Sequence, residues 1–406
     1  MSAEVTFVRR RLDSIAQVGG GLALGRSVSE GASVELPYLR VANVQDGHID
    51  TSDMKTVRVL PAEVERYRVR EGDLLLTEGG DFDKLGRGAV WDGRFPICLH
   101  QNHVFRLRAN RKFVLPEYLS LYMASWRGRQ YFLNVAKQTT NLATISSSQL
   151  KAMPIEVPDL KDQRRIVEIL NSVRELEKAS EGLILKLRTL RRSAVATALP
   201  REGKQGYLQD VRWVPVAEAG SVRMGKQLSP DSQRSVVQYP YLRVANVLAG
   251  RIDYSDVKTM GFSGRELCVY GLEPGDILLN EGQSLELVGR SAIYEEKSGE
   301  FFFQNTLLRF RSSGEVLPRY AQAVFSSWLE SGKFAEIAKK TTSIAHLGGE
   351  RFGALRFPVI SISDQRRIID ILQAWDVKIS DEERALKKLN DLKRGLVQDL
   401  LAGKRA

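Results

Sequence analysis

The stretch YLRVANV at Tyr38–Val44 decides how the chain is organised, because it returns unchanged at Tyr241–Val247. A second stretch, DQRRI at Asp162–Ile166, returns unchanged at Asp364–Ile368. The first pair lies 203 positions apart and the second 202, so one residue was lost between them, just before Leu317. A period of about 200 residues is the size of a domain and far exceeds a solenoid repeat. We therefore expect two copies of one unit, related by a pseudo-twofold.

The composition is that of a folded soluble protein. Of 406 residues, 43% are hydrophobic. The longest apolar runs fall well short of the roughly 18 residues of a membrane helix, and the first residues are charged where a signal peptide is apolar, so we expect a cytoplasmic protein. Cys98 and Cys268 occupy non-equivalent places in the two copies, which argues against a disulfide framework or a cysteine metal site; both should be reduced and buried.

The chain carries a net charge of +11. This charge suits a polyanionic partner such as nucleic acid, but it is spread thinly along the sequence. Charge alone therefore leaves two interpretations open, a DNA-binding protein and a merely soluble basic protein.

Each copy begins with a mixed α/β domain. Short β-prone stretches bounded by Gly, Asp or Pro, such as 38–41, 73–76 and 104–108, predict strands. Apolar residues at helical spacing over 117–136 and 319–338, each after a proline, predict helices. The fold class is therefore α+β.

A long helix is predicted to follow each domain, because apolar residues then step by three and four over about 38 residues, a heptad seam. In the first copy the seam is Ile166, Ile169, Val173, Leu176, Ser180, Leu183, Leu187, Leu190, Ala194 and Thr197. In the second it is Ile368, Ile371, Trp375, Lys378, Glu382, Ala385, Leu389, Leu392 and Leu396. We expect the two helices to pair as an antiparallel coiled coil that separates the domains; the alternative is that each helix folds back onto its own domain.

These patterns predict four segments. They are a first domain at 1–158, a helix at 159–200, a second domain at 201–360, and a second helix with a short tail at 361–406. Pro200 ends the first helix, and Ser363 is the expected cap of the second.

Two such domains, each closed by a proline-bearing connector, a DQRRI helix start and a long heptad helix, resemble the DNA specificity (S) subunits of type I restriction-modification systems. The stretch Leu396–Lys404 also resembles the close of that family's second helix, whereas 195–200 departs from the leucine-rich closure of its first.

The resemblance implies separate roles for the two domains, the long helices and the partner subunits. Each domain would be a target-recognition domain that reads one half of a split site in double-stranded DNA. The helices would set the spacing and dock two methyltransferase (M) subunits, which carry S-adenosylmethionine and the catalytic residues; motor and nuclease (R) subunits can join. The chain itself would be non-catalytic and bind no cofactor or metal.

Two modules that share a backbone but read different half-sites should differ where they contact bases. The loop after Glu78-Gly79 differs from its counterpart after Glu281-Gly282 although the flanking residues match. The expected base contacts are Asp81, Lys84, Gln283, Ser284 and Glu286, with Arg87 and Arg290 as phosphate anchors. The alternative is a surface loop without a function.

A second pair of segments follows the predicted helices of the two domains. Hydroxyl, amide and lysine side chains there are of the types that bind phosphates and base edges. The residues are Lys137, Gln138, Thr139, Thr140 and Asn141 in the first copy and Lys339, Lys340, Thr341, Thr342 and Ser343 in the second. An ordinary turn at a helix end is the alternative.

Identical stretches, in contrast, should be structural. We assign Arg40 and Arg243, within YLRVANV, to strand and core, together with Gln101-Asn102 and Gln304-Asn305. A basic face near Arg188 is interpreted as solvated.

Signals of catalysis are weak. Gly220–Lys226 imitates a phosphate loop, but Gln227 stands where the magnesium-binding hydroxyl is needed. His100 and His103 should point to opposite faces of a strand, and the second copy has Phe303 and Thr306 there, so a metal site is not expected.

Two alternatives to a DNA-reading subunit stay open at this point. One is a stand-alone metal-dependent nuclease that uses Asp276 with Glu295 and Lys297. The other is an assembly scaffold whose domains bind polypeptides rather than DNA.

Overall fold

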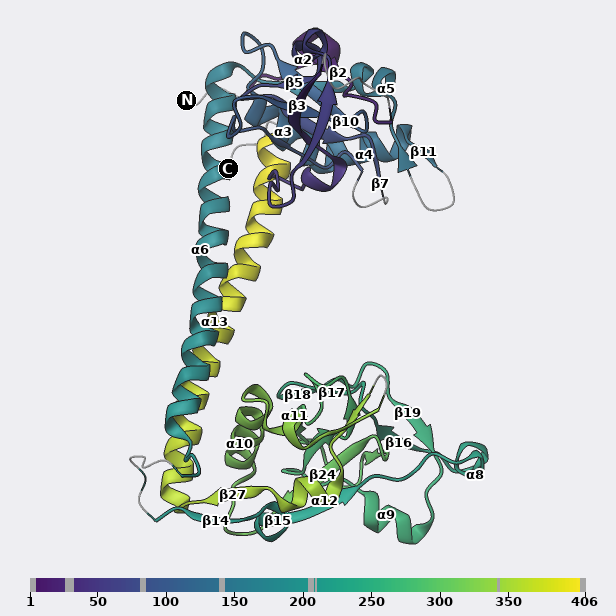
Figure 1. Cartoon of the computed structure of the whole chain (residues 1–406), viewed down its shortest axis with the longest axis vertical. Helices are drawn as coiled ribbons and strands as arrows, with labels where there is room; N and C mark the ends of the chain where they lie inside the picture. Colours follow the sequence, from purple (N-terminus) through teal and green to yellow (C-terminus); the bar gives the residue numbers. More distant parts are fainter. Residues whose placement is uncertain are drawn as a thin grey trace. The chain divides into compact units, whose positions relative to one another are not determined.

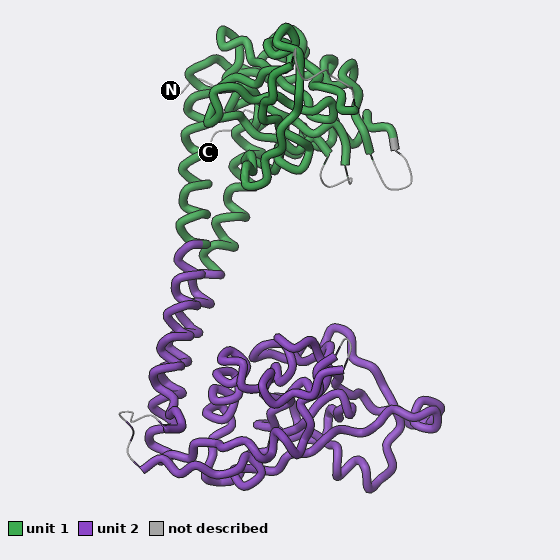
Figure 2. Tube along the Cα trace, viewed as in Figure 1, with its two compact units in different colours: residues 1–181, 384–406 green, residues 182–383 purple. Residues whose placement is uncertain are grey.

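The computed structural model describes residues 5–25, 33–80, 85–138, 143–203, 208, 210–341 and 344–401. The chain divides into two compact units (Figure 2). Unit 1 comprises Met1–Glu181 and Arg384–Ala406, and unit 2 comprises Gly182–Glu383. The division cuts both long helices, α6 (Leu160–Ala198) and α13 (Ile362–Leu401), so each unit holds part of each helix. Within the described residues, no helix is both long and apolar enough to span a bilayer.

Unit 1 is built around two four-stranded sheets (Figure 1). The first is antiparallel, in the order β2 (Ala16–Gly19), β10 (Val104–Ala109), β6 (Leu74–Thr77) and β8 (Gly88–Val90). The second has the order β4 (Lys55–Val59), β3 (Val34–Leu39), β9 (Cys98–His100) and β5 (Arg68–Val69), with β3 and β9 parallel. Strand β1 (Val8–Arg11) pairs with β13 (Pro154–Val157). The helices are α1 (Leu12–Ile15), α2 (Pro61–Tyr67), α3 (Pro116–Ala124), α4 (Trp126–Val135) and α5 (Ser147–Ala152).

Unit 2 repeats this plan. Its antiparallel sheet runs β15 (Gly220–Met224), β24 (Leu307–Ser312), β20 (Ile277–Asn280) and β22 (Ser291–Ile293). The smaller sheets are β19 (Lys258–Met260), β16 (Tyr239–Leu242) and β23 (Phe302–Phe303); β17 (Val247–Leu248) with β18 (Arg251–Ile252); and β14 (Arg212–Pro215) with β27 (Arg356–Val359). The helices are α7 (Val216–Ala219), α8 (Pro230–Arg234), α9 (Gly264–Tyr270), α10 (Pro318–Glu330), α11 (Lys333–Ile337) and α12 (Gly349–Ala354).

The predicted helices after the two prolines are present, but each is broken. In unit 1 the break falls at Ser125, whose side chain accepts a hydrogen bond from the Gly128 N–H and caps α4. In unit 2 it falls at Gly332, which has a left-handed φ of 81° that suits glycine. Cys98 is buried as expected, whereas Cys268 is exposed.

A buried glutamine ties the start of each long helix to its domain. Gln163 accepts a hydrogen bond from the Leu115 N–H at 2.8 Å and donates to the carbonyls of Phe113 and Pro158. Gln365 makes the equivalent three bonds, with Leu317, Glu315 and Ile360. Both glutamines are fully buried, which explains why this residue of the DQRRI stretch is the same in both copies.

The two long helices pack against each other in antiparallel orientation, as predicted. In unit 1, Glu177 of α6 pairs with Lys393 of α13. In unit 2, Arg188 pairs with Glu383 and Arg191 with Asp376. The residue numbers fall along α13 as they rise along α6, so the helices are antiparallel. These pairs also give the basic face near Arg188 anionic partners within unit 2.

The seam lies one residue away from half of its predicted positions. Residues such as Ile166, Val173, Leu187 and Ile368 are buried as expected. Leucines predicted inside are instead exposed: Leu176, Leu183, Leu190 and Leu392, together with Ile371. Residues one position after a predicted seam position are buried instead, namely Leu170, Glu177, Ile184, Leu372 and Ile379. Steps of three and four from Ile166 fit both the predicted seam and the observed one, and packing against the partner helix favours the observed one.

The helix caps also differ slightly from expectation. Ser361, rather than Ser363, caps α13, because its hydroxyl accepts a hydrogen bond from the Asp364 N–H. In α6 the Asp159 carboxylate accepts the equivalent bond from the Asp162 N–H.

A buried carboxylate stabilises the core of each unit. Asp276 is 1% exposed; Arg311 donates two hydrogen bonds to it, at 2.6 and 2.7 Å, and the Glu273 N–H donates a third. In unit 1, Arg108 and the Arg70 N–H do the same for Asp73. All of these acceptor sites face protein donors, so Asp276 is a structural residue rather than a metal ligand.

We predict that Asp276→Ala destabilises unit 2 by about 3 kcal/mol, because it leaves the Arg311 guanidinium and a backbone N–H without their acceptor. Asp73→Ala should affect unit 1 instead. Hydrogen exchange in urea measures the free energy of unfolding of each unit separately. Glu295→Ala, at an exposed position, is the control. A stably folded Asp276→Ala chain that had lost magnesium-dependent DNA cleavage would instead support the nuclease alternative.

Unit 1 also buries a histidine. His100 is fully buried, and its Nδ1 lies 2.8 Å from the Val104 carbonyl oxygen. Burial lowers the pKa of His100 from 6.5 to about 4. Between these values the unfolded chain binds a proton that the folded chain does not, so stability must fall as the pH falls. Unit 2 has Phe303 at the equivalent place, also fully buried.

Unit 1 should therefore lose about 2 kcal/mol between pH 7 and pH 5 through His100. His100→Phe should remove this part of the pH dependence, and His48→Ala, at an exposed position of the same unit, should retain it. Hydrogen exchange of unit 1 peptides at the two pH values measures the difference. Identical pH dependence in wild type and His100→Phe would contradict the prediction.

Candidate nucleic-acid interface

A small three-stranded sheet in unit 1 contains residues from both regions that the sequence predicts to contact DNA. Strand β12 (Ala143–Thr144) pairs on one side with β7 (Gly79–Gly80) and on the other with β11 (Lys137–Gln138). Strands β7 and β11 therefore lie in one sheet, on either side of β12, although about 60 residues separate them in sequence. The sequence predicted both segments but did not connect them.

Unit 2 builds the same sheet. Strand β26 (Ala345–His346) lies between β21 (Gly282–Gln283) and β25 (Lys339–Lys340). Unit 1 has glycines in both β7 positions, and the Cβ of a larger residue at Gly79 would come within 2.8 Å of Thr144. One shared frame therefore carries two different sets of side chains.

Several predicted contacts lie outside the described residues: Asp81, Lys84, Thr139, Thr140, Asn141, Thr342 and Ser343. For Gln138 the structure describes the backbone, within β11. Lys137 lies in the same strand and is exposed.

In unit 2 the structure brings residues of the two predicted segments together. Glu286 and Lys340 are both exposed, and the pKa of Glu286 is lowered by hydrogen bonds from its own backbone N–H and from Ser284, and further by the charge of Lys340. The Gln283 side chain accepts a hydrogen bond from the Ser284 N–H. Lys339 is exposed, and Thr341 bonds to the Ile344 carbonyl in the turn after β25. This surface offers cations, hydroxyls and amides, the groups that contact nucleic acid.

The two predicted phosphate anchors occupy equivalent turns. Arg87 follows Gly86, and Arg290 follows Gly289; both glycines have positive φ, of 68° and 82°. A Cβ at Gly289 would come within 2.2 Å of Phe334, so no larger residue fits. Both arginines are half-buried, their Nε atoms have no hydrogen-bond partner among the described residues, and burial lowers the pKa of Arg290.

The identical stretches hold each domain together. Asn43 accepts a hydrogen bond from the Arg40 N–H and donates to two backbone carbonyls, and the Arg40 side chain pairs with Asp53. Unit 2 repeats this with Asn246, Arg243 and Asp256.

The Gln-Asn pairs likewise use their backbone within the fold. The N–H groups of Gln101 and Asn102 donate to the Leu39 and Leu22 carbonyls, at 2.9 Å each. Those of Gln304 and Asn305 donate to Leu242 and Lys226.

The residues considered for catalysis are engaged in structure. Lys226 is mostly buried, pairs with Glu266 at 2.6 Å and donates to the Gly261 carbonyl, so it is not available to a nucleotide phosphate. Among the described residues, no group of three or more His, Cys, Asp or Glu side chains could hold a metal ion.

Sequence reasoning missed two histidines at this site. His103 contacts Glu78, and His346 contacts Glu281, each at 3.0 Å. His103 was set aside because the second copy has Thr306 there, and His346 lies where the first copy has Thr144. The chain has four histidines, so each of them could have been considered individually as a candidate site residue.

The first half of the chain matches a known family model. Residues 4–187 match the type I restriction modification DNA specificity domain. The chain is 22% identical to the EcoKI type I restriction enzyme specificity subunit of Escherichia coli K12 over 91% of its length and 82% of that protein. It is 26% identical to the MjaX specificity subunit of Methanocaldococcus jannaschii, where the match spans 45% of each chain.

Solved structures agree with the fold. A chain from a structure described as "complex assembly and conformational transition of the type I R-M system" matches with a TM-score of 0.70 at 16% identity, covering 98% of this chain and 99% of that one. The HsdS subunit of Thermoanaerobacter tengcongensis matches with a TM-score of 0.54 at 18% identity, covering 98% and 97%. The repeat, the paired helices and these matches agree with one another: residues 4–187 match the DNA specificity domain of type I restriction-modification systems, and the chain is similar over 91% of its length to a specificity subunit of such a system.

Proposed function

We propose that each unit reads one half of a bipartite site in double-stranded DNA. The observation that carries the proposal is the small sheet of each unit, where a shared frame presents two unlike sets of polar side chains. Two modules that read different bases are expected to share a backbone and to differ in the side chains at the surface that contacts DNA. Arg87 and Arg290, which occupy equivalent turns, suit the phosphate contacts that both modules need.

The two units also share an exposed face, at the start of each long helix. Arg164, Glu168 and Asn171 of α6 match Arg366, Asp370 and Gln373 of α13, and all six are exposed. A partner that binds both units must find the same chemistry twice, so this matched face, unlike the unmatched small sheets, suits one kind of protein bound in two copies.

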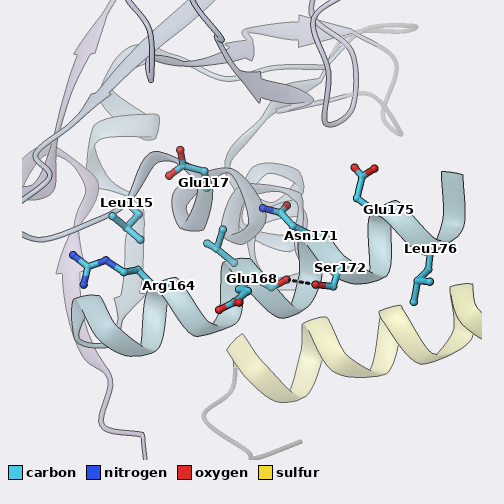
Figure 3. Close-up of a pocket in the computed structure, with 9 residues that line it drawn as sticks. Leu115, Glu117, Arg164, Glu168, Asn171, Ser172, Glu175 and Leu176 are labelled. Carbon is cyan, nitrogen blue, oxygen red and sulfur yellow. Dashed lines mark hydrogen bonds between the residues drawn. The ribbon is translucent and has the colours of Figure 1, made fainter. Parts of the chain in front are cut away.

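In unit 1 the face borders a hollow between α6 and the start of α3, lined by Leu115, Glu117 and the exposed Leu176 as well as the matched residues (Figure 3). In unit 2, Ile369 and Gln373 line a hollow as well. Exposed leucine beside charged residues is typical of a protein-binding surface.

We assign the matched face to two methyltransferase subunits. The chain is a non-catalytic specificity subunit, so S-adenosylmethionine and the methyl transfer belong to those partners, and DNA cleavage to motor and nuclease subunits where these join. The chain itself binds no cofactor in this proposal. A complex that modifies cellular DNA works in the cytoplasm, where we place the chain.

Exchange of residues 1–155 for the corresponding domain of another family member tests the reading of DNA. In the assembled methyltransferase complex, the exchange should change one half of the methylated sequence and leave the other half unchanged, because unit 2 is intact. Sequencing of methylated DNA measures both halves. A methylated sequence that stays the same, or that changes in both halves, would contradict the proposal.

A charge reversal tests the docking face. Arg164→Glu with Glu168→Arg should remove one methyltransferase subunit, and Arg366→Glu with Asp370→Arg should remove the other, because each pair lies on one unit. These exposed changes should alter stability by less than about 0.5 kcal/mol. Native mass spectrometry counts the bound subunits. Lys161→Glu, at an exposed position with Ser363 as its counterpart, is the control; two subunits bound to every variant would disprove the assignment.

A further inference from the structure

In both units a histidine contacts the glutamate that precedes the variable loop. Nδ1 of His103 lies 3.0 Å from Oε2 of Glu78, and Nδ1 of His346 lies 3.0 Å from Oε2 of Glu281. Glu78 immediately precedes β7, and Glu281 immediately precedes β21, so both pairs stand at the small sheets.

The two glutamates have the same backbone surroundings. The Glu78 N–H donates to the carbonyl of His103, and its carbonyl accepts from Ile145. The Glu281 N–H donates to Thr306, and its carbonyl accepts from Leu347, which are the equivalent positions. The backbone of the glutamate is thus held alike in both units.

The two histidines, in contrast, come from different elements. His103 lies in the turn between β9 and β10, where unit 2 has Thr306. His346 lies in strand β26, where unit 1 has Thr144. Two positions that do not correspond in the repeat therefore bring an imidazole to the same carboxylate.

Stability does not explain this convergence. The side chains of His103 and His346 are 59% and 43% exposed, and exposed ion pairs contribute little to stability. The remaining histidines do not show the arrangement: His100 is buried against a carbonyl, and His48 lies in an exposed turn.

The chemistry of the pair suits the recognition of a base. A carboxylate accepts hydrogen bonds, so Nδ1 carries a proton and the ring is held in one orientation. Nε2, at the far edge of the ring, is then presented to a partner. On a neutral ring it accepts a hydrogen bond, as from the amino group of cytosine or adenine in the major groove; on a charged ring it donates, as to guanine.

The ring approaches the shared glutamate from a different element in each unit, so we expect Nε2 to occupy a different place relative to the common frame. A phosphate contact common to both modules would need no such difference, whereas two different base contacts would. Cationic neighbours favour DNA as the ligand: His346 lies opposite Lys339 across the sheet, and in unit 1 Lys137 lies opposite Thr144 at the equivalent positions.

We infer that His103 and His346 are specificity-determining residues, each contacting one base edge of its own half-site, and that Glu78 and Glu281 are their positioning residues. This inference rests on the proposed function, that each unit reads one half of a bipartite DNA site.

The test uses the assembled methyltransferase complex and a DNA library randomised at each position of the two half-sites. Sequencing of the methylated products gives a base preference at every position. His103→Ala should reduce discrimination at one position of one half-site by roughly 10- to 100-fold and leave the other half-site unchanged. His346→Ala should do the same in the other half-site only.

The glutamates supply a second readout. Glu78→Ala should relax the same single position as His103→Ala, and the double variant should be no worse than either alone, because the two residues act as one unit. Uniform weakening at all positions would assign His103 to a phosphate or to the fold and overturn the inference, as would unchanged preferences. His48→Ala, in the same unit, is the matched control and should retain the wild-type preferences.

Failure of the inference differs from failure of the proposed function. If the wild-type complex shows no preference for a two-part sequence, the proposed function is wrong. If the wild type reads two half-sites and both histidine variants read them equally well, only the assignment of His103 and His346 is wrong.

Discussion

Each unit depends on one buried amide. Gln163 and Gln365 satisfy three backbone groups apiece at the point where a long helix leaves its domain. A buried donor or acceptor without a partner costs about 1–3 kcal/mol, so removal of the amide would leave several such groups unsatisfied at once. The amide also fixes where the helix starts relative to the sheet, because its partners lie on the segment before α3 or α10 as well as on the connector. The direction of each helix, and with it the placement of the matched face, follows from this small cluster of bonds.

The need of buried polar groups for hydrogen-bond partners also distinguishes the parts of the units that are the same in both copies from the parts that differ. Buried polar groups such as Asp73, Asp276, Asn43 and Asn246 require specific partners, so both copies keep them together with those partners. The small sheets are held mainly by backbone hydrogen bonds, which place few demands on side chains. A frame of this kind accepts new residues at its surface without loss of the fold, which suits the proposed reading of a different half-site by each unit.

Much of this architecture could be predicted from the sequence, because the internal repeat supplied a comparison that a single domain lacks. It distinguished structural positions, which are identical in the two copies, from candidate DNA-contacting positions, which differ. It also predicted two long helices that pair in antiparallel orientation. The side of each helix that faces its partner was predicted only in part. Leu176 and Glu177 illustrate the reason: hydrophobicity favours the leucine at the seam, but Lys393 provides a charge that allows the glutamate to be buried instead. The small sheets were missed because strands of two residues carry almost no periodicity. The histidines were missed because comparison of equivalent positions cannot detect residues that converge from non-equivalent ones.

The two units differ in how the chain supplies them, and this difference affects biosynthesis. Unit 2 is one continuous segment, whereas unit 1 takes residues from both halves of the chain, and Leu401 is buried in its core with Ile166 and Leu170. During translation the domain that is made first keeps part of its apolar surface uncovered until Leu401 and its neighbours in α13 have been synthesised. Unit 2 can complete its contacts earlier, although it lies later in the gene. The order of synthesis and the order of completion are therefore reversed.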